Sequence, residues 1–233
     1  ITPDLLVSLQ PSNVNECVGG TDQMSVTVTG GSGTIGYQWQ SSTTGTSVSF
    51  TNIGGATAST YTPSSAVAGT TYYRVVISAT GSGCGSIVSD TSNAVITPDL
   101  LVSVQPSNVN ECVGGTDQMS VTVTGGSGTI GYQWQSSTTG TSVSFVNIGG
   151  ATASTYTPSS AVAGTTYYRV VISATGSGCG SIVSDTSNAV IIPDLLVSVQ
   201  PTNINECIGG TDQMSVTVTG GSGTIGYQWQ TSA

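Results

Sequence analysis

The amino-acid sequence repeats itself with a period of 95 residues. Residues 2–96 and 97–191 align without a gap and differ at only two positions, and a third copy begins at Ile192 and continues for 42 residues. A period of this length exceeds the roughly 20 to 50 residues of solenoid repeats, and it approaches the roughly 100 residues of a small autonomous sandwich. We therefore predict three consecutive domains: residues 1–96, residues 97–191, and an incomplete third domain, residues 192–233, that holds the first three strands.

Apolar residues within a repeat recur at every second position, which is the spacing of half-buried β-strands. Tyr73, Val75 and Ile77, for example, alternate with Tyr72, Arg74 and Val76. Glycine-rich turn signals separate seven or eight such runs, and no stretch has helical periodicity. The predicted fold class is therefore all-β, with antiparallel sandwiches of the immunoglobulin-like kind. The expected strands lie near residues 5–9, 24–29, 35–40, 48–53, 60–61, 72–77 and 87–96 of the first repeat.

The joints between the repeats are short. Asn93–Ile96 leads directly into Thr97-Pro98 without a linker rich in glycine and serine. Because a short joint that contains proline restricts bending, we expect the domains to be placed end to end, with neighbouring repeats of the same chain as their first partners.

Composition excludes several functional classes. The chain has two arginines, eleven acidic residues and no histidine. Charged residues make up 6% of it, whereas soluble globular domains average about 25%. Nucleic acid and anionic lipid both require a basic surface that this chain lacks. No apolar run is long enough for a transmembrane helix, so no membrane insertion is expected. Without histidine, the usual catalytic triads lose their base. We expect neither an enzyme nor a bound cofactor.

The five cysteines follow the repeat. Each complete repeat has one near its beginning and one near its end, 67 positions apart. The strands beside them face each other across an immunoglobulin-like sandwich. We therefore predict the disulfides Cys17–Cys84 and Cys112–Cys179, which leaves Cys207 unpaired in this chain. Disulfides indicate an extracellular, oxidising setting. Buried free thiols are the alternative, and the spacing does not suit a zinc site.

Acidic residues near the joint raise the question of calcium. Asp90, Asp99 and Glu111 are the first candidates for ligands. They form no calcium-loop motif and are too scattered to supply the six to eight oxygens that the ion prefers. We therefore expect no metal site, and stability that does not change with chelators.

The two arginines are candidates for a surface contact. Arg74 and Arg169 lie at equivalent positions, and strand alternation places them on an outer face beside Tyr72 and Tyr167. One interpretation is a cross-strand hydrogen-bonding or stacking role toward neighbouring glutamines. The other is a contact to sugar or to another domain. Trp39 and Trp134 fall on the inward set and are expected in the core.

The third copy has an uncovered apolar face. Its three predicted strands are not followed by the strands that cover the inner face in a complete repeat. Several apolar side chains would then lie in water, namely Met214, Val216, Val218, Ile225, Tyr227 and Trp229. Such a patch is unusual on a finished monomer. We expect the following strands to come from a longer repeat protein, or alternatively from another subunit by strand complementation.

Four segments resemble a known family. They are Tyr37-Gln38-Trp39-Gln40, Asn52–Thr57, Ser59–Pro63 and Thr71–Val76. In this order they are similar to the immunoglobulin-like repeats of giant Bacteroidota cell-surface adhesins, the gliding-motility and attachment proteins exported by the type IX system. In that family both cysteine positions of a repeat are commonly occupied, and the repeats carry no catalytic residues.

The resemblance implies a function. We expect structural stalk or fibre repeats of an extracellular adhesin, outer-membrane-attached or secreted, that extend an adhesive tip or form a filament for attachment or gliding. The alternative is a module that binds carbohydrate or a neighbouring filament. Its surface would be the neutral polar face around the two arginines, and its partners would be surface glycans or other filament chains.

Overall fold

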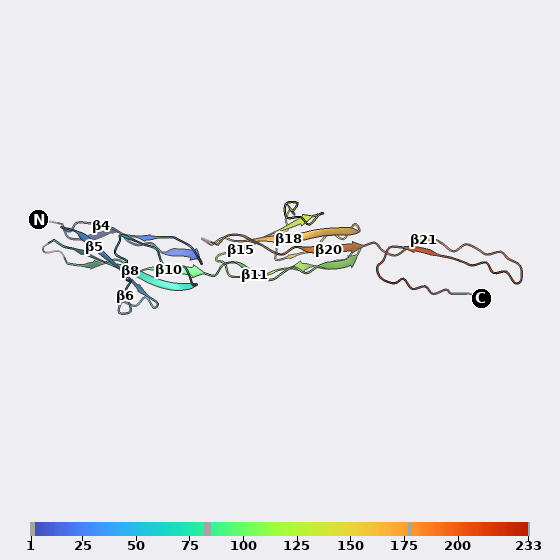
Figure 1. Ribbon diagram of the computed structural model, residues 1–233, viewed down its shortest axis with the longest axis horizontal. Coiled ribbons are helices and arrows are strands. Elements are labelled where there is room, and N and C mark those ends of the chain that lie inside the picture. Colours follow the sequence, from blue (N-terminus) through green and yellow to red (C-terminus); the bar gives the residue numbers. More distant parts are fainter. Residues whose placement is uncertain (1–2, 82–84, 177–178, 233) are drawn as a thin grey trace. The chain divides into compact units, whose positions relative to one another are not determined.

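The computed structural model describes residues 3–81, 85–176 and 179–232 (Figure 1). Strands and turns make up this described part, without helices. The chain divides into two compact units: one comprises residues 1–101, 123–131 and 173–182, and the other comprises residues 102–122, 132–172 and 183–233. The predicted all-β fold class is confirmed.

Ten strands form the first repeat in its described residues, 3–81 and 85–96. They are β1 (Leu6–Leu9), β2 (Val14–Cys17), β3 (Met24–Ser25), β4 (Thr27–Thr29), β5 (Ile35–Ser42), β6 (Thr51–Asn52), β7 (Thr60–Tyr61), β8 (Gly69–Ala79), β9 (Ile87–Val88) and β10 (Ser92–Thr97). The longest, β8, consists largely of β-branched and aromatic residues, which suit a pleated surface that is buried on one face.

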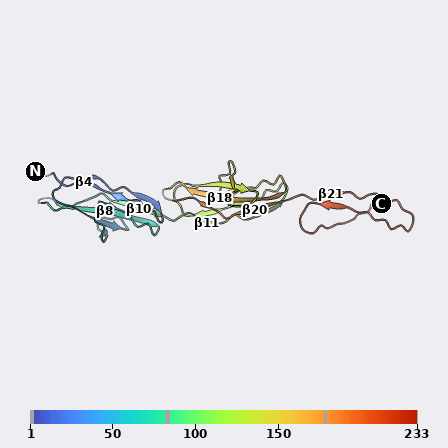
Figure 2. The same cartoon turned by 45° about the horizontal axis from the view of Figure 1, so that its top comes forward.

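These strands build the two layers of a sandwich (Figure 2). One sheet has the order β2-β10-β8-β5-β6, with β9 paired to β8. The opposite layer consists of the pairs β1-β4 and β3-β7. Val26 lies between β3 and β4, and its N–H donates to the Ser59 carbonyl at 3.0 Å, so the hydrogen bonding continues across the break.

Strand β2 was not among the predicted strands. It pairs in parallel with β10, so that Val14 is opposite Ala94 and Cys17 is opposite Thr97. Its four residues include two buried apolar ones, Val14 and Cys17, but also the charged Glu16. A strand this short and this polar has little periodicity to reveal it.

The core of the first repeat lies between the two layers. Trp39, Met24, Val75 and Ile77 have no exposed surface. The alternation of β8 is as predicted, with Tyr73, Val75 and Ile77 buried. The buried residues of this core cluster are Leu5, Val14, Met24, Val26, Trp39, Tyr73, Val75, Ile77, Ala94 and Ile96.

The second repeat forms the equivalent ten strands in the part of it that the structure describes. They are β11 (Leu101–Val104), β12 (Val109–Cys112), β13 (Met119–Ser120), β14 (Thr122–Thr124), β15 (Ile130–Ser137), β16 (Val146–Asn147), β17 (Thr155–Tyr156), β18 (Gly164–Ala174), β19 (Ile182–Val183) and β20 (Ser187–Ile192). The sheet order β12-β20-β18-β15-β16 repeats that of the first copy.

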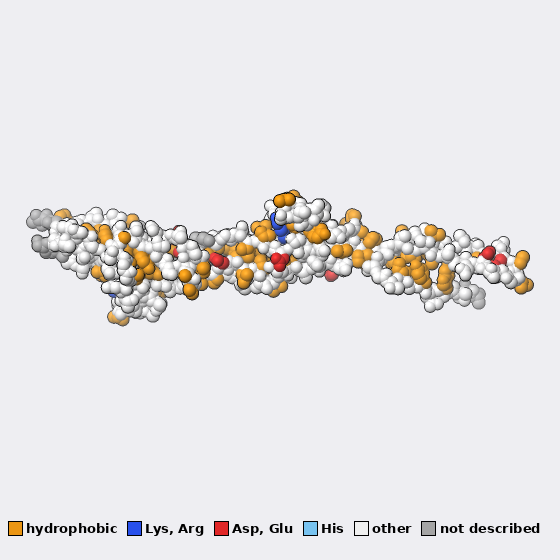
Figure 3. Space-filling view, in the orientation of Figure 1, with side chains coloured by type: hydrophobic (Ala, Val, Ile, Leu, Met, Phe, Trp, Pro, Cys, Tyr) orange, Lys and Arg blue, Asp and Glu red, His pale blue; other side chains and the backbone are white. Residues whose placement is uncertain are grey.

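The third copy has two strands in the described residues, β21 (Leu196–Val199) and β22 (Thr217–Thr219), which pair with each other. Trp229 is 51% exposed, whereas its counterparts Trp39 and Trp134 are fully buried. Figure 3 shows hydrophobic side chains gathered on the surface of this segment. The expected exposure of its inner face is confirmed for Met214, Tyr227 and Trp229. Val216, Val218 and Ile225 are partly covered.

Candidate functional site

The arginine of each repeat is held by its own sheet. Arg74 of β8 is opposite Gln40 of β5, and its Nε donates to the Gln40 Oε1 at 2.7 Å. The guanidinium also lies over the ring of Phe50, with 4.2 Å between Cζ and the ring centroid. Arg169 repeats the arrangement with Gln135 and Phe145 at the same distances. These contacts correspond to the cross-strand and stacking role.

The neighbouring tyrosines are also covered within their repeats. Gly45, with φ of +69°, lies against the ring of Tyr72, so that a Cβ at Gly45 would be 2.9 Å from the Tyr72 Cγ. Gly140 stands in the same relation to Tyr167. The four predicted contact residues therefore lie together in pairs on one face of each repeat, half-buried rather than freely exposed.

Both tryptophans of the complete repeats belong to the core, as predicted. The Trp39 Nε1 donates to the Ala58 carbonyl at 2.9 Å, and its ring stacks on Tyr61 with centroids 5.6 Å apart. Tyr61 in turn packs against Tyr73 at 5.4 Å. Burial raises the pKa of Tyr61 and of Tyr73 above the ordinary value of 10.0, and the nearby Tyr61 adds to the effect on Tyr73.

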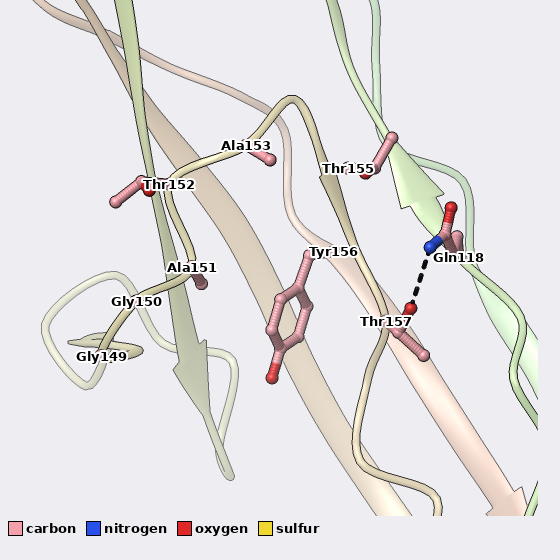
Figure 4. Close-up of a pocket in the computed structure, with 9 residues that line it drawn as sticks. All are labelled: Gln118, Gly149, Gly150, Ala151, Thr152, Ala153, Thr155, Tyr156 and Thr157. Atoms are coloured by element: carbon pink, nitrogen blue, oxygen red, sulfur yellow. Dashed lines mark hydrogen bonds between the residues drawn. The ribbon is translucent and has the colours of Figure 1, made fainter.

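In the second repeat, a shallow depression of about 390 Å³ lies beside Tyr156, the counterpart of Tyr61 (Figure 4). The loop residues Gly149–Ala153 and the strand around Tyr156 line it, and Gln118 donates to the Thr157 hydroxyl at 3.2 Å across one side. The first repeat has the equivalent depression, of about 320 Å³. The residues that line the two depressions include no charged side chain, and burial raises the pKa of the tyrosine in each.

The cysteines differ from the predicted pairing. Cys17 is bonded to Cys179, with Cα atoms 5.2 Å apart and a sequence separation of 162. Cys112 is therefore left without its predicted partner and is a free, exposed thiol, as is Cys207. Cys84 lies outside the described residues. The predicted pairs Cys17–Cys84 and Cys112–Cys179 were wrong, because Cys179 bonds to the cysteine of the preceding repeat.

The register of the strands gives the physical reason. In the second repeat, Cys112 is opposite Ile192, beside the start of β18 at Gly164. Strand β18 then runs to Ala174, a distance of about 33 Å at about 3.3 Å per residue, and Cys179 follows that far end. Disulfides need Cα atoms within about 7 Å. The prediction assumed that the first cysteine precedes strand β3 directly, whereas it ends the unforeseen β2.

The Cys17–Cys179 bond lies within the first compact unit, which includes the loops 123–131 and 173–182. The Thr97 hydroxyl is 3.2 Å from the Cys17 Sγ and 3.6 Å from the Cys179 Sγ. Ser127 Oγ is 3.9 Å from the Cys179 Sγ. Sequence reasoning missed Thr97, although one signal was present: the equivalent position one period later is Ile192.

The residue before Cys17 carries a buried carboxylate. Glu16 is 3% exposed, and its Oε2 accepts from the Asp22 N–H at 2.9 Å. Its Oε1 is buried without a hydrogen-bond partner in the described structure, and the Oε1 of Glu111 shares this condition. Gly20 packs against the same carboxylate, where an added Cβ would be 2.1 Å from Oε2.

No three side chains among His, Cys, Asp and Glu lie close enough to hold a metal ion within the described ranges. Asp90, Asp99 and Glu111 are accordingly not brought together there. The described residues also contain no helix that is long and apolar enough to cross a membrane.

Solved structures with a similar fold are immunoglobulin domains. A three-domain immunoglobulin fragment of titin aligns with a TM-score of 0.53 and 12% identity, over 94% of this chain and 77% of that one. A second titin fragment, from the I-band, gives 0.51 and 12%, over 86% and 70%. Immunoglobulin domains 1–5 of Sidekick-1 give 0.49 and 12%, over 87% of this chain but 42% of that one. The chain is thus a tandem array of immunoglobulin-like sandwiches.

The family is identified from sequence. Residues 10–98 and 103–193 each match the family described as Domain of unknown function (DUF8696). The chain belongs to this family. None of the curated proteins compared with it matches.

Proposed function

We propose that the chain forms structural repeats of an extracellular bacterial surface adhesin, a stalk or fibre whose domains, residues 1–96, 97–191 and 192–233, follow one another end to end. The stalk would extend an adhesive tip or build a cell-surface filament for attachment or gliding. The resemblance to the Bacteroidota adhesin repeats suggests this role, and an oxidising extracellular location fits the disulfide.

The observation that carries the proposal is the equivalence of the two complete repeats. Each has its own buried core, and their two differences, Leu9 against Val104 and Thr51 against Val146, all fall on exposed positions. A catalytic or binding site needs one competent copy, whereas a spacer gains length from every copy. Repetition of an intact core with changes confined to the surface is therefore what a spacer requires.

Small-angle X-ray scattering tests the spacer role. Removal of residues 97–191 deletes one period and joins residue 96 to Ile192, as residue 191 is joined now. Strands of ten to twelve residues along the long axis give a repeat of about 40 Å. The maximum dimension should fall by about this amount. An unchanged maximum dimension, or a compact globule for the whole chain, would contradict the proposal.

A binding module for carbohydrate or a neighbouring filament is the second candidate. In its favour, the chain has 6% charged residues, so like-charge repulsion opposes side-by-side packing only weakly. Against it, both arginines are engaged by a glutamine and a phenylalanine of their own repeat. Glycan-array binding that disappears in the double variant Arg74→Ala/Arg169→Ala, and persists in Gln23→Ala, would favour this candidate over a passive spacer.

A further inference from the structure

Cys17 and Cys112 occupy the same position in two nearly identical repeats, yet their states differ. Each ends a short strand, β2 or β12, that pairs in parallel with the last strand of its repeat. Cys17 is 2% exposed and bonded, while Cys112 is exposed and free. The local sequences from Pro11 to Gly36 and from Pro106 to Gly131 are identical, so the difference cannot come from the strand itself.

The difference is what covers each cysteine. The loop 173–182, which carries Cys179, belongs to the same compact unit as Cys17. A counterpart of this loop for Cys112 would come from a third complete repeat, and residues 192–233 contain only the counterpart of residues 97–138. Glu16 and Glu111 show the same contrast, because Glu16 is buried whereas Glu111 is partly exposed.

The spacing defines a register. Cys17 and Cys179 are 162 positions apart, one period longer than the 67 positions that separate the two cysteines of one repeat. The bond thus joins the first cysteine of one repeat to the second cysteine of the next. Cys207 is also a first cysteine and is no candidate partner for Cys112 in this register.

We propose that Cys112 is the receiving site for the second cysteine of another copy of this repeat, the equivalent of Cys179. Cys84, the second cysteine of the first repeat, then has its partner in a preceding copy. Successive copies are joined head to tail by one disulfide at each junction, so that the array is linked covalently through side chains as well as through the backbone.

The bond forms by oxidation of two thiols. The Cys112 thiolate attacks a small-molecule disulfide such as oxidised glutathione, which releases one glutathione thiolate and leaves a mixed disulfide. The incoming cysteine then attacks the Cys112 sulfur and releases the second glutathione. In total, two protein thiols lose two protons and two electrons, and one glutathione disulfide is reduced to two thiols. The exposure of Cys112 gives both reactants access.

Cleavage by trypsin after the two arginines allows the disulfide linkage to be identified. The chain has no other basic residue, so trypsin yields three fragments after denaturation: residues 1–74 with Cys17, residues 75–169 with Cys84 and Cys112, and residues 170–233 with Cys179 and Cys207. The chain should be incubated at increasing concentration with reduced and oxidised glutathione, alkylated, denatured and digested without reduction. Covalent multimers should then contain a disulfide-linked pair of 75–169 fragments, which joins Cys112 of one chain to Cys84 of another.

Matched variants identify the atoms. Cys112→Ser and Cys84→Ser should each abolish the 75–169 pair and leave the link between fragments 1–74 and 170–233 intact. Cys207→Ser should retain the pair. Multimers that depend on Cys207 alone, or a 75–169 pair that survives Cys112→Ser, would overturn the proposal.

A lengthened version of the chain makes formation of the Cys112 disulfide independent of protein concentration. A copy of residues 139–191 added after Ala233 completes the third repeat and supplies the loop in the same molecule. Cys112 should then link the 75–169 fragment to the short fragment that follows the newly added arginine. If that short fragment is instead linked to the one that carries Cys207, the pairing is within a repeat and the proposal fails. A Cys112 that stays free in this chain overturns it equally.

Discussion

Cys17 and Cys179 form a disulfide although 162 positions separate them, and their Cα atoms are 5.2 Å apart. The bond therefore does not cross the core of one sandwich, as the bond between the two sheets of antibody domains does. It ties the end of β2 in the first repeat to a loop that belongs to the second repeat in sequence. The bond lies within the first compact unit and outside the apolar core cluster of the first repeat.

Peptide mapping without reduction should show this pairing in the monomer. Trypsin should release fragments 1–74 and 170–233 as one linked species and fragment 75–169 free, because Cys84 and Cys112 both lie in the latter. The pairing within each repeat would instead link all three fragments through Cys17–Cys84 and Cys112–Cys179. Mass spectrometry of the intact digest distinguishes the two results, and a reduced sample serves as the control.

Loss of the bond should lower the melting temperature without disrupting the sandwiches. In Cys17→Ser, the loop of 162 positions is no longer closed, which costs at most about 5 kcal/mol in the chain-entropy estimate and about 10 to 20 °C in melting temperature. The far-ultraviolet circular dichroism should not change, since the buried apolar core of the repeat does not include the bond. Cys112→Ser is the matched control and should melt like the parent chain. Equal melting of both variants would argue against the bond.

The sandwich fold could be predicted because its signals are local. Period-two alternation identifies β5 and β8, and the inward set of β8 is buried as expected. The placement of Trp39 in the core follows from the same alternation. Such patterns depend only on the two faces of a single strand, and consecutive residues of the sequence alternate between these faces.

The cysteine pairing could not be predicted because it depends on β2. Four residues that contain Asn15 and Glu16 give too weak a pattern to show that Cys17 ends a strand beside β10. Without that strand, Cys17 is assigned to the wrong end of the repeat. Arg74 had two interpretations in the sequence, and its stacking on Phe50 is a contact that spacing alone does not reveal.

The accessible tryptophan should be Trp229 alone. It is 51% exposed, whereas Trp39 and Trp134 are fully buried. Acrylamide should therefore quench one of three tryptophans strongly in the native chain. Trp229→Phe should remove the quenchable fraction, and Trp39→Phe should retain it. Completion of the third repeat with a copy of residues 139–191 should protect Trp229, because the equivalent of Tyr156 would stack on it as Tyr156 stacks on Trp134. Continued quenching in the completed chain would contradict this packing.

Four tyrosines that are buried or partly buried against the core should make the chain sensitive to alkali. Burial raises the pKa of Tyr61, Tyr73, Tyr156 and Tyr168 above the ordinary value of 10.0. A raised pKa means that the folded state favours the neutral phenol. Its contribution is therefore fully present below pH 10 and is lost as the pH rises through the folded-state pKa.

Absorbance at 295 nm during an alkaline titration measures this behaviour. These four should ionise above pH 10 and together with unfolding. Tyr61→Phe in the first repeat should remove one late-titrating group and shift the alkaline unfolding midpoint of that repeat upward. Ionisation of these four tyrosines at their ordinary pKa of 10.0 in the folded chain would contradict the effect of burial.

Arg74→Ala should destabilise the first repeat by about 1 to 2 kcal/mol, because it removes a charge-assisted hydrogen bond to Gln40 and the stacking on Phe50. Arg74→Lys keeps the charge but lacks Nε, so it should recover only part of the loss. Arg169→Ala should have the same effect on the second repeat, and the two should add in the double variant since the contacts are separate. Urea unfolding followed by tryptophan fluorescence gives these values, with the exposed Thr51→Val as a control, because Val146 already stands at that position in the second repeat. Arginine variants that unfold at the parent urea concentration would instead leave these side chains free for a surface contact.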